Sequence, residues 1–208
     1  MMSVLLAEHG VTDCVGYARE YVEGLHDCLA SLDLEEVAEV IGYIEDAYDE
    51  GKQVFIIGNG GSAGTASHMA ADLDKNILPE RHPDGTRRLR ALSLTDNVAW
   101  ITALANDLGY EHVFSEQLKN LVQEGDLVIA ISGSGKSPNI LEGMRAARHA
   151  GARVVALLGF DGGPAKDLAD AYVLVGARRY GYVEDLHAML IHLITSYFAT
   201  SNGAGGRV

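Results

Sequence analysis

Five short apolar runs, each followed by a longer segment, restrict this chain to a small set of folds. Runs that are apolar on both faces are typical of parallel strands buried inside a sheet, and the segments between them have the period or length of helices. Strands that alternate with helices form a doubly wound sheet. We therefore predict an α/β fold with a five-stranded parallel sheet. The expected strands are 53–58, 89–94, 127–131, 154–158 and 172–175.

The first 50 residues precede these strands and have a helical period, which predicts an N-terminal helical pair. The pair is long and apolar for a cover on one sheet edge, so it either packs on the domain or is buried in a homo-oligomer. A chain of 208 residues that is 48% apolar suits a single domain, 1–208. We expect N-terminal helices for packing or oligomerisation (1–50), an α/β core (51–200) and a frayed tail (201–208).

The charge of the chain excludes several classes of partner. Its 29 acidic and 16 basic side chains give a net charge of -13, which repels nucleic-acid phosphates and anionic membranes. No run approaches the about 20 apolar residues that cross a bilayer. We expect a cytoplasmic protein with no nucleic-acid and no membrane partner. An anionic ligand would have to be held by local backbone N–H groups and hydroxyls.

Two expected strand-to-helix turns are rich in glycine and hydroxyl groups. They are GNGGS at 58–62 and SGSGKS at 132–137, and both follow strands at the edge of the sheet where ligands bind. Either turn alone could be an ordinary tight turn with a helix N-cap, but the two together favour a phosphate group. Nucleotide binding fits less well. Ala130 stands where the Walker A loop needs glycine, and GNGGSAG matches the dinucleotide fingerprint only loosely.

These turns belong to a longer resemblance. GNGGSAGTASHMAADL, ITALANDLGYEHVFSEQL, GDLVIAISGSGKSPNIL and VEDLHAMLIH resemble, in this order, the phosphoheptose isomerase family of SIS (sugar isomerase) domains. The resemblance implies the flavodoxin-like SIS fold, a homo-oligomer expected to be a tetramer, and isomerisation of sedoheptulose 7-phosphate to D-glycero-D-manno-heptose 7-phosphate. Positions that match the family's substrate- and phosphate-binding residues are Asn59, Gly60, Gly61, Ser62, Asn106, Asp107, Ser132, Gly133, Ser134, Ser137 and Glu184.

The resemblance also marks side chains for the chemistry. His68 and Asp72 match the family's His-x-x-x-Glu and share one helical face, although this spacing alone more often marks a solvent-facing pair. On the last helix Glu184 and His192 match the family's Gln and catalytic His. His192 has apolar neighbours and would otherwise be read as a core residue. His187, between them, could be a core or a subunit-interface histidine.

Two of these positions depart from the family. Asp72 replaces a Glu and is one methylene shorter, and Glu184 replaces a Gln and adds a carboxylate. Isomerisation needs a base to move a proton between adjacent carbons and an acid to serve the oxygens. We expect catalysis by Asp72, Glu184 and His192, with Glu184 taking or sharing the base role and His192 as the acid.

The donors of His68, Asp72, Glu184 and His192 also suit a metal, and some members of the family bind zinc there. One Zn2+ per subunit is therefore the expected cofactor. The alternative is a metal-free site in which one carboxylate has a raised pKa. Two other functions stay open: an isomerase of another ketose phosphate, and a non-catalytic SIS-fold adaptor that resembles the replication-initiator-associating proteins. The retained histidines argue against the adaptor.

Overall fold

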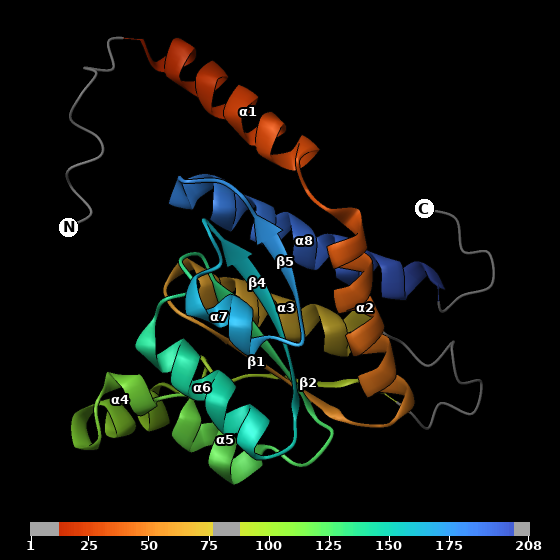
Figure 1. Ribbon diagram of the computed structural model, residues 1–208, viewed down its shortest axis with the longest axis vertical. Coiled ribbons are helices and arrows are strands. Elements are labelled where there is room, and N and C mark those ends of the chain that lie inside the picture. The colour runs from red at the N-terminus through yellow and green to blue at the C-terminus, as the bar shows by residue number, and fades with distance from the viewer. Residues whose placement is uncertain (1–12, 77–87, 202–208) are drawn as a thin grey trace.

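A five-stranded parallel sheet forms the centre of the computed structural model, which describes residues 13–76 and 88–201. The strand order is β2-β1-β3-β4-β5, so the predicted α/β fold with flavodoxin-like winding is confirmed (Figure 1). The order reverses between β1 and β3, and the crevice at that reversal is where such sheets bind ligands. The strands are β1 (Gln53–Gly58), β2 (Arg90–Ser93), β3 (Leu127–Ser132), β4 (Arg153–Gly159) and β5 (Ala171–Val175).

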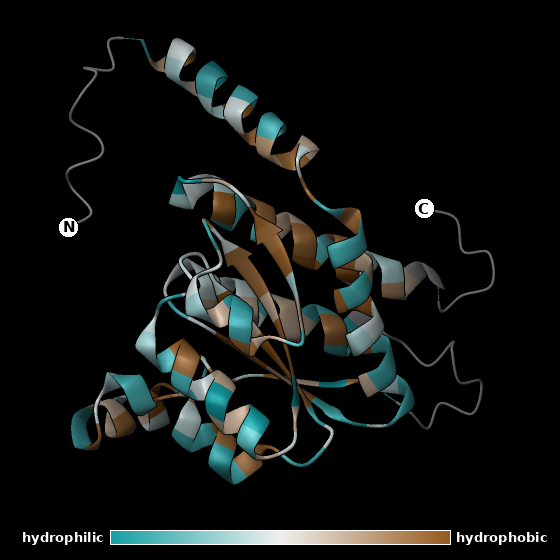
Figure 2. Cartoon of the chain, viewed as in Figure 1, coloured by the Kyte–Doolittle hydropathy of each residue, from teal (hydrophilic) through white to brown (hydrophobic). Residues whose placement is uncertain are grey.

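Helices cover both faces of the sheet and enclose its apolar strands in two core clusters (Figure 2). One cluster joins the sheet to α2 (Leu34–Asp49), α3 (Gly61–Asn76) and α8 (Tyr180–Ser201). The other face carries α4 (Val98–Asp107), η2 (Tyr110–His112), α5 (Ser115–Leu121), α6 (Pro138–His149) and α7 (Gly163–Leu168). All six residues of β3 are buried, which explains why its sequence is apolar without alternation.

The predicted N-terminal helical pair is confirmed, but its two members differ. α2 packs on the sheet, whereas α1 (Cys14–Ala30) has no buried residue (Figure 1). The hydroxyl of Tyr21 on α1 donates a hydrogen bond of 2.7 Å to Asp185 on α8. Val22 and Leu29 of the same helix remain exposed. Much of the apolar surface of α1 is therefore uncovered within one chain.

Glycines allow the β3–α6 turn to pack directly on the β4–α7 turn. Gly135 has a φ of 61°, and a Cβ there would clash with the carbonyl oxygen of Gly162. The Ala165 N–H donates to the Gly135 carbonyl at 3.1 Å. L side chains rarely adopt this φ, so both the backbone conformation and the lack of space for a Cβ require glycine at position 135. The two turns therefore form one closely packed rim at the carboxyl edge of the sheet.

Residues 202–208 lie outside the described part, so the frayed tail at 201–208 stays a prediction. The division into 1–50 and 51–200 within one domain also stays a prediction. Among the helices within 13–76 and 88–201, none has the length and apolar character needed to cross a membrane.

Candidate functional site

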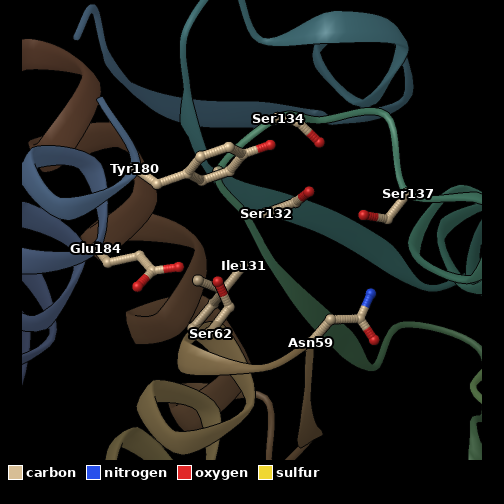
Figure 3. Close-up of a pocket in the computed structure, with 9 residues that line it drawn as sticks. Asn59, Ser62, Ile131, Ser132, Ser134, Ser137, Tyr180 and Glu184 are labelled. Atoms are coloured by element: carbon tan, nitrogen blue, oxygen red, sulfur yellow. The ribbon is translucent and has the colours of Figure 1, made fainter. Parts of the chain in front are cut away.

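A hollow of about 130 Å³ lies at the carboxyl ends of the central strands, where both predicted turns meet the start of α8 (Figure 3). This volume is well below the about 300 Å³ at which small-molecule pockets usually begin, so it suits one compact group of a larger ligand. We call it the phosphate hollow, from the chemistry that its turns offer. Its lining is Asn59, Ser62, Ile131, Ser132, Gly133, Ser134, Ser137, Tyr180 and Glu184.

The serines of the β3–α6 turn are arranged to donate hydrogen bonds into the hollow. The Ser132 hydroxyl oxygen accepts from the Gly135 N–H at 3.1 Å, and the Ser134 oxygen accepts from the Lys136 N–H at 3.2 Å. Each hydroxyl still has its own proton to donate. Ser137 is the N-cap residue of α6, yet its side chain makes no capping bond. The turn therefore presents three O–H groups to an anion.

The starts of two helices add positive potential at the same place. α3 begins at Gly61 and α6 at Pro138, and each start adjoins a residue that lines the hollow. The first N–H groups of a helix have no partner within the helix and favour an anion. Gly60, with a φ of 56°, makes the sharp entry into α3. Backbone and hydroxyl donors together are the local anion cradle that an acidic protein requires.

Three residues that support or line the hollow were not predicted from the sequence. Asn59 and Asn139 exchange two side-chain amide hydrogen bonds of 2.8 Å, which tie the two turns together. The Tyr110 hydroxyl donates to the Asn59 oxygen at 3.0 Å. Tyr180 covers one side of the hollow. Asn139 stands two residues after the serine turn and Tyr110 lies in a segment that resembles the family, so both could have been noticed there, whereas no such signal marks Tyr180.

Glu184 is the charged side chain among the residues that line the hollow. Its carboxylate lies against the first residue of α3, because a Cβ on Gly61 would be 2.7 Å from Glu184 Oε2. The positive end of the α3 dipole stabilises a carboxylate at this position. The same negative charge opposes a bound phosphate, so the neutral and backbone donors must outweigh it.

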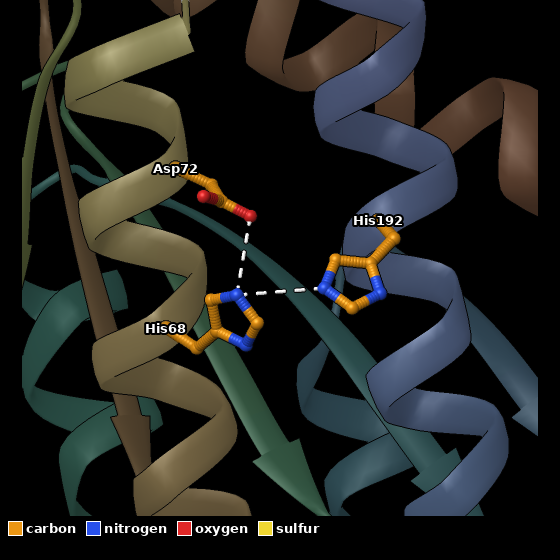
Figure 4. A group of neighbouring side chains, drawn as sticks. All are labelled: His68, Asp72 and His192. Atoms are coloured by element: carbon orange, nitrogen blue, oxygen red, sulfur yellow. Dashed lines mark hydrogen bonds and ion pairs between the residues drawn. The ribbon is translucent and has the colours of Figure 1, made fainter.

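A second group of functional side chains lies between α3 and α8 (Figure 4). His68 Nε2 is 3.4 Å from Asp72 Oδ2 and 3.4 Å from His192 Nε2. Ligand atoms about 2.1 Å from a tetrahedral metal lie about 3.4 Å from one another, and both separations from His68 match this spacing. The His68–Asp72 distance alone would equally suit an ion pair. The approach of two imidazole nitrogens on different helices is what favours a shared cation.

The predicted four-residue set is divided between these two places. The donor atoms of His68, Asp72 and His192 lie within 4.8 Å of one another, and Glu184 is outside that group. Glu184 lies about two helical turns earlier on α8, at the phosphate hollow.

The predicted pair Asn106 and Asp107 lies elsewhere. Both residues are exposed at the end of α4, and they bond to each other at 2.8 Å. Neither lines the phosphate hollow of a single chain.

His187 is a core residue. It is 1% exposed, and its Nε2 lies 3.1 Å from the carbonyl oxygen of Leu158 at the end of β4. A carbonyl can only accept, so Nε2 carries the proton. Burial lowers the pKa of His187 to about 4, partly opposed by this hydrogen bond. The neutral ring therefore fastens α8 to the sheet between Glu184 and His192.

Comparison with known proteins gives consistent matches over most of the chain. A family model described as the SIS domain matches residues 17–159. A probable phosphoheptose isomerase of Thermoplasma acidophilum is 36% identical over 177 residues, which is 85% of this chain and 94% of that protein. The phosphoheptose isomerase of Nitratiruptor sp. is 39% identical over 151 residues, 73% of this chain and 78% of that protein. The solved structure of phosphoheptose isomerase GmhA from Neisseria gonorrhoeae has a TM-score of 0.78 at 28% identity, covering 88% and 95% of the two chains.

Proposed function

The chain belongs to the SIS domain family and, within it, to the phosphoheptose isomerases, and from this premise we propose that it converts sedoheptulose 7-phosphate to D-glycero-D-manno-heptose 7-phosphate. Its class of activity, phosphosugar isomerisation, follows from the family. The seven-carbon substrate is our proposal. The observation that carries it is the pairing of a phosphate-sized hollow with a histidine–carboxylate cluster along the same two helices, α3 and α8.

In this proposal the 7-phosphate occupies the phosphate hollow and the carbon chain extends between α3 and α8. Ser132, Ser134 and Ser137 donate to the phosphate oxygens, helped by the start of α3. Carbons 1 and 2 then lie between the Glu184 carboxylate and His192. Holding the phosphate end fixes the position of the reacting end, which lowers the entropic cost of the reaction.

We propose that Glu184 is the base and His192 the acid. Asp72 is engaged with His68 at 3.4 Å, whereas no hydrogen bond or ion pair of Glu184 is found among the described residues. The Glu184 carboxylate removes a proton from carbon 1 and returns it to carbon 2 through an enediolate. His192 gives a proton to the oxygen on carbon 2 and takes one from the oxygen on carbon 1. No proton is gained or lost overall, so no other reactant is needed.

The E184Q variant tests this assignment. Loss of the base is expected to lower kcat by about 100-fold or more, whereas an amide of equal size preserves the shape of the site. E184Q that turns over like the unmodified chain would exclude Glu184 as the base and leave Asp72 for that role.

We also propose one zinc ion per subunit, held by His68, Asp72 and His192, whereas Glu184 lies at the phosphate hollow and is not part of this donor set. The two 3.4 Å separations support this donor set. A bound divalent cation supplies a Lewis acid that polarises the substrate carbonyl. Asp72 and His68 would then act only as ligands. His192 would face the ion through Nε2 and keep the proton on Nδ1 for the transfer, while Glu184 remains the base.

We propose a homotetramer as the working form. Support comes from α1, which has no buried residue and leaves Val15 and Val22 more than half exposed. Large apolar side chains in such a row are commonly covered by another subunit. Light scattering on the purified protein is expected to give four times the chain mass of 22.2 kDa.

The function is tested by incubating the purified protein with sedoheptulose 7-phosphate and following formation of the aldose phosphate. The assay is run before chelation, after chelation and after re-addition of zinc. Turnover that is lost on chelation and restored by zinc supports both the reaction and the metal. Turnover that is unchanged by chelation would contradict the proposed zinc ion and would still support the isomerase activity.

Substrate identity is tested in the same assay by replacing the seven-carbon ketose with shorter ketose phosphates. Faster turnover of a shorter substrate would move the assignment to another phosphosugar. Absence of turnover with every sugar phosphate, together with capture of a replication-initiator protein, would favour the adaptor function.

A further inference from the structure

A second and larger hollow, of about 680 Å³, lies beside the phosphate hollow. The two share Ser134 and Tyr180 as wall residues, and Figure 3 shows these side chains side by side above the phosphate hollow. An anion bound at Ser134 would therefore lie at the opening between them. The second hollow is lined by Ser134, Lys136, Phe160, Asp161, Arg178 and Tyr180.

Three consecutive strand-to-helix connections supply this lining, at the sheet edge where α/β proteins bind ligands. Lys136 follows β3, Phe160 and Asp161 follow β4, and Arg178 follows β5. The first two connections are held together by the close packing of Gly135 on Gly162 and by a Lys136–Asp161 ion pair of 3.2 Å. The rim of the second hollow is thus an extension of the same structure that shapes the phosphate hollow.

Tyr180 forms part of the wall between the two hollows and is paired with Phe160 of the second hollow. The rings of Phe160 and Tyr180 meet edge to face with centroids 4.8 Å apart. Phe160 has a φ of 55°, which is uncommon for a bulky side chain and concentrates at functional sites. Gly133 lets Tyr180 approach the serine turn, because a Cβ there would be 3.2 Å from the Tyr180 ring. The wall is therefore set by specific backbone features on both of its sides.

The charges in the second hollow leave one cation without a partner in the part of the chain that the structure describes. Lys136 is paired with Asp161, and its hydrogen bond is the main cause that lowers the pKa of the Asp161 carboxyl. Arg178 has no ion pair or hydrogen bond to any residue in the described ranges. In a chain with a net charge of -13, an arginine facing a hollow without a carboxylate partner is a specific attraction for an anion.

We propose that the second hollow is an anion subsite for a phosphoryl group linked to the one in the phosphate hollow, so that the site also binds diphosphates. The inference rests on the proposed function, because it assumes that the first phosphoryl group binds at Ser132 and Ser134. A phosphate held there has two directions of exit. One runs past Glu184 toward the histidine cluster, and the other runs past Tyr180 to Arg178. A bound diphosphate would block the sugar phosphate and inhibit turnover.

The test is titration calorimetry of the full chain with inorganic phosphate and with inorganic diphosphate. The variants are R178A and, as a matched control, R145A, which removes an equally exposed arginine that pairs with Glu142 on α6. The unmodified chain and R145A are expected to bind diphosphate at least about tenfold more tightly than phosphate, because an arginine–phosphate contact adds a charge-assisted bond. R178A should lose most of that preference and keep its phosphate affinity. Diphosphate can also extract a metal ion, but this effect is common to all three proteins and cancels between them.

Three results would contradict the anion subsite or distinguish its failure from failure of the phosphate hollow. Equal affinity of the unmodified chain for phosphate and diphosphate would reject the subsite while leaving the phosphate hollow intact. Equal loss in R145A and R178A would reject it as a general charge effect. Absence of phosphate binding in all three proteins would instead reject the phosphate hollow, and with it the proposed function.

Discussion

The phosphate hollow and the histidine cluster are neighbours, but they are built in different ways. Backbone shapes the hollow: Ser62 and Ser132 are buried, and close packing of Gly135 on the Gly162 backbone leaves no room for a side chain. The cluster is made of side chains that reach across two helices, and the His68 side chain is 51% exposed. Of the two departures from the family pattern, Asp72 belongs to the cluster and Glu184 lines the hollow, and both change a side chain and leave the backbone-built turns as they are. We infer that the backbone-built part fixes what is bound, while the side-chain part can change how it reacts.

The H192A variant tests whether catalysis and phosphate binding are separate functions of these two regions. Removal of the proposed acid and metal donor is expected to lower kcat by about 10²- to 10⁴-fold, while phosphate affinity stays within about twofold. Calorimetry and initial rates on the same preparation measure both quantities. H149A, on the far end of α6, is the matched control and should leave both unchanged. A parallel loss of phosphate affinity in H192A would show that the two regions do not have separate functions.

The complementary change is G135A, in the backbone-built region. Steric conflict with the Gly162 carbonyl and an unfavourable φ are expected to lower the free energy of unfolding by about 4 kcal/mol. Denaturant unfolding measures the change. G42A is the control, because a Cβ in that position on α2 meets nothing within 4 Å. It should raise stability by about 0.5–1 kcal/mol, as expected for alanine inside a helix. A G135A chain as stable as the unmodified one would contradict the assigned role of this turn.

The fold was predictable because its signals are local. Short apolar runs identified all five strands, including β2 and β5, whose burial alternates. Their alternation with helices predicted a doubly wound parallel sheet, and the flavodoxin-like winding came from the resemblance to the SIS family. The serine turn was visible for the same reason, since its glycines and hydroxyls are consecutive in the chain. What the sequence could not supply was which of Glu184 and His192 meets His68 and Asp72, because that depends on how α8 passes α3.

The role of α1 was undecided for a related reason. Its apolar stripe was compatible with packing on the domain, and in the structure Tyr21 and Leu25 pack against the core while Val15 and Val22 stay exposed. Likewise Tyr110 is 51 residues from Asn59, so their hydrogen bond has no signature in the sequence. Local periodicity predicts which residues are apolar or helical, but contacts between distant elements follow from packing.

The buried His187 tests how α8, which runs from the phosphate hollow to the histidine cluster, is held on the sheet. Its folded pKa of about 4 lies below the ordinary value of 6.5, so it is neutral in both folded and unfolded chains above pH 6.5. As the pH falls from 6.5 to 4, only the unfolded chain gains this proton, and the free energy of unfolding should fall by about 3 kcal/mol.

The comparison that isolates this residue is H187Q, whose amide can still donate to the Leu158 carbonyl. H187Q should match the unmodified chain at pH 7.5 and lose less stability between pH 6.5 and 4. The measurement is denaturant unfolding at a series of pH values. Identical pH profiles for the two chains would mean that His187 is not the buried neutral group that fastens α8 to the sheet.

The S137A variant tests whether the phosphate hollow contributes to substrate binding alone. S137A removes one hydroxyl that faces the phosphate, and a hydrogen bond to a charged group is worth about 1.5 kcal/mol, or roughly tenfold in binding. Because the phosphate is remote from the reacting carbons, the loss should appear as an about tenfold higher KM with kcat unchanged. S31A, on the turn after α1, is the control. A fall in kcat instead would mean that Ser137 contributes to the transition state, so that the backbone-built hollow participates in the chemistry as well as in binding.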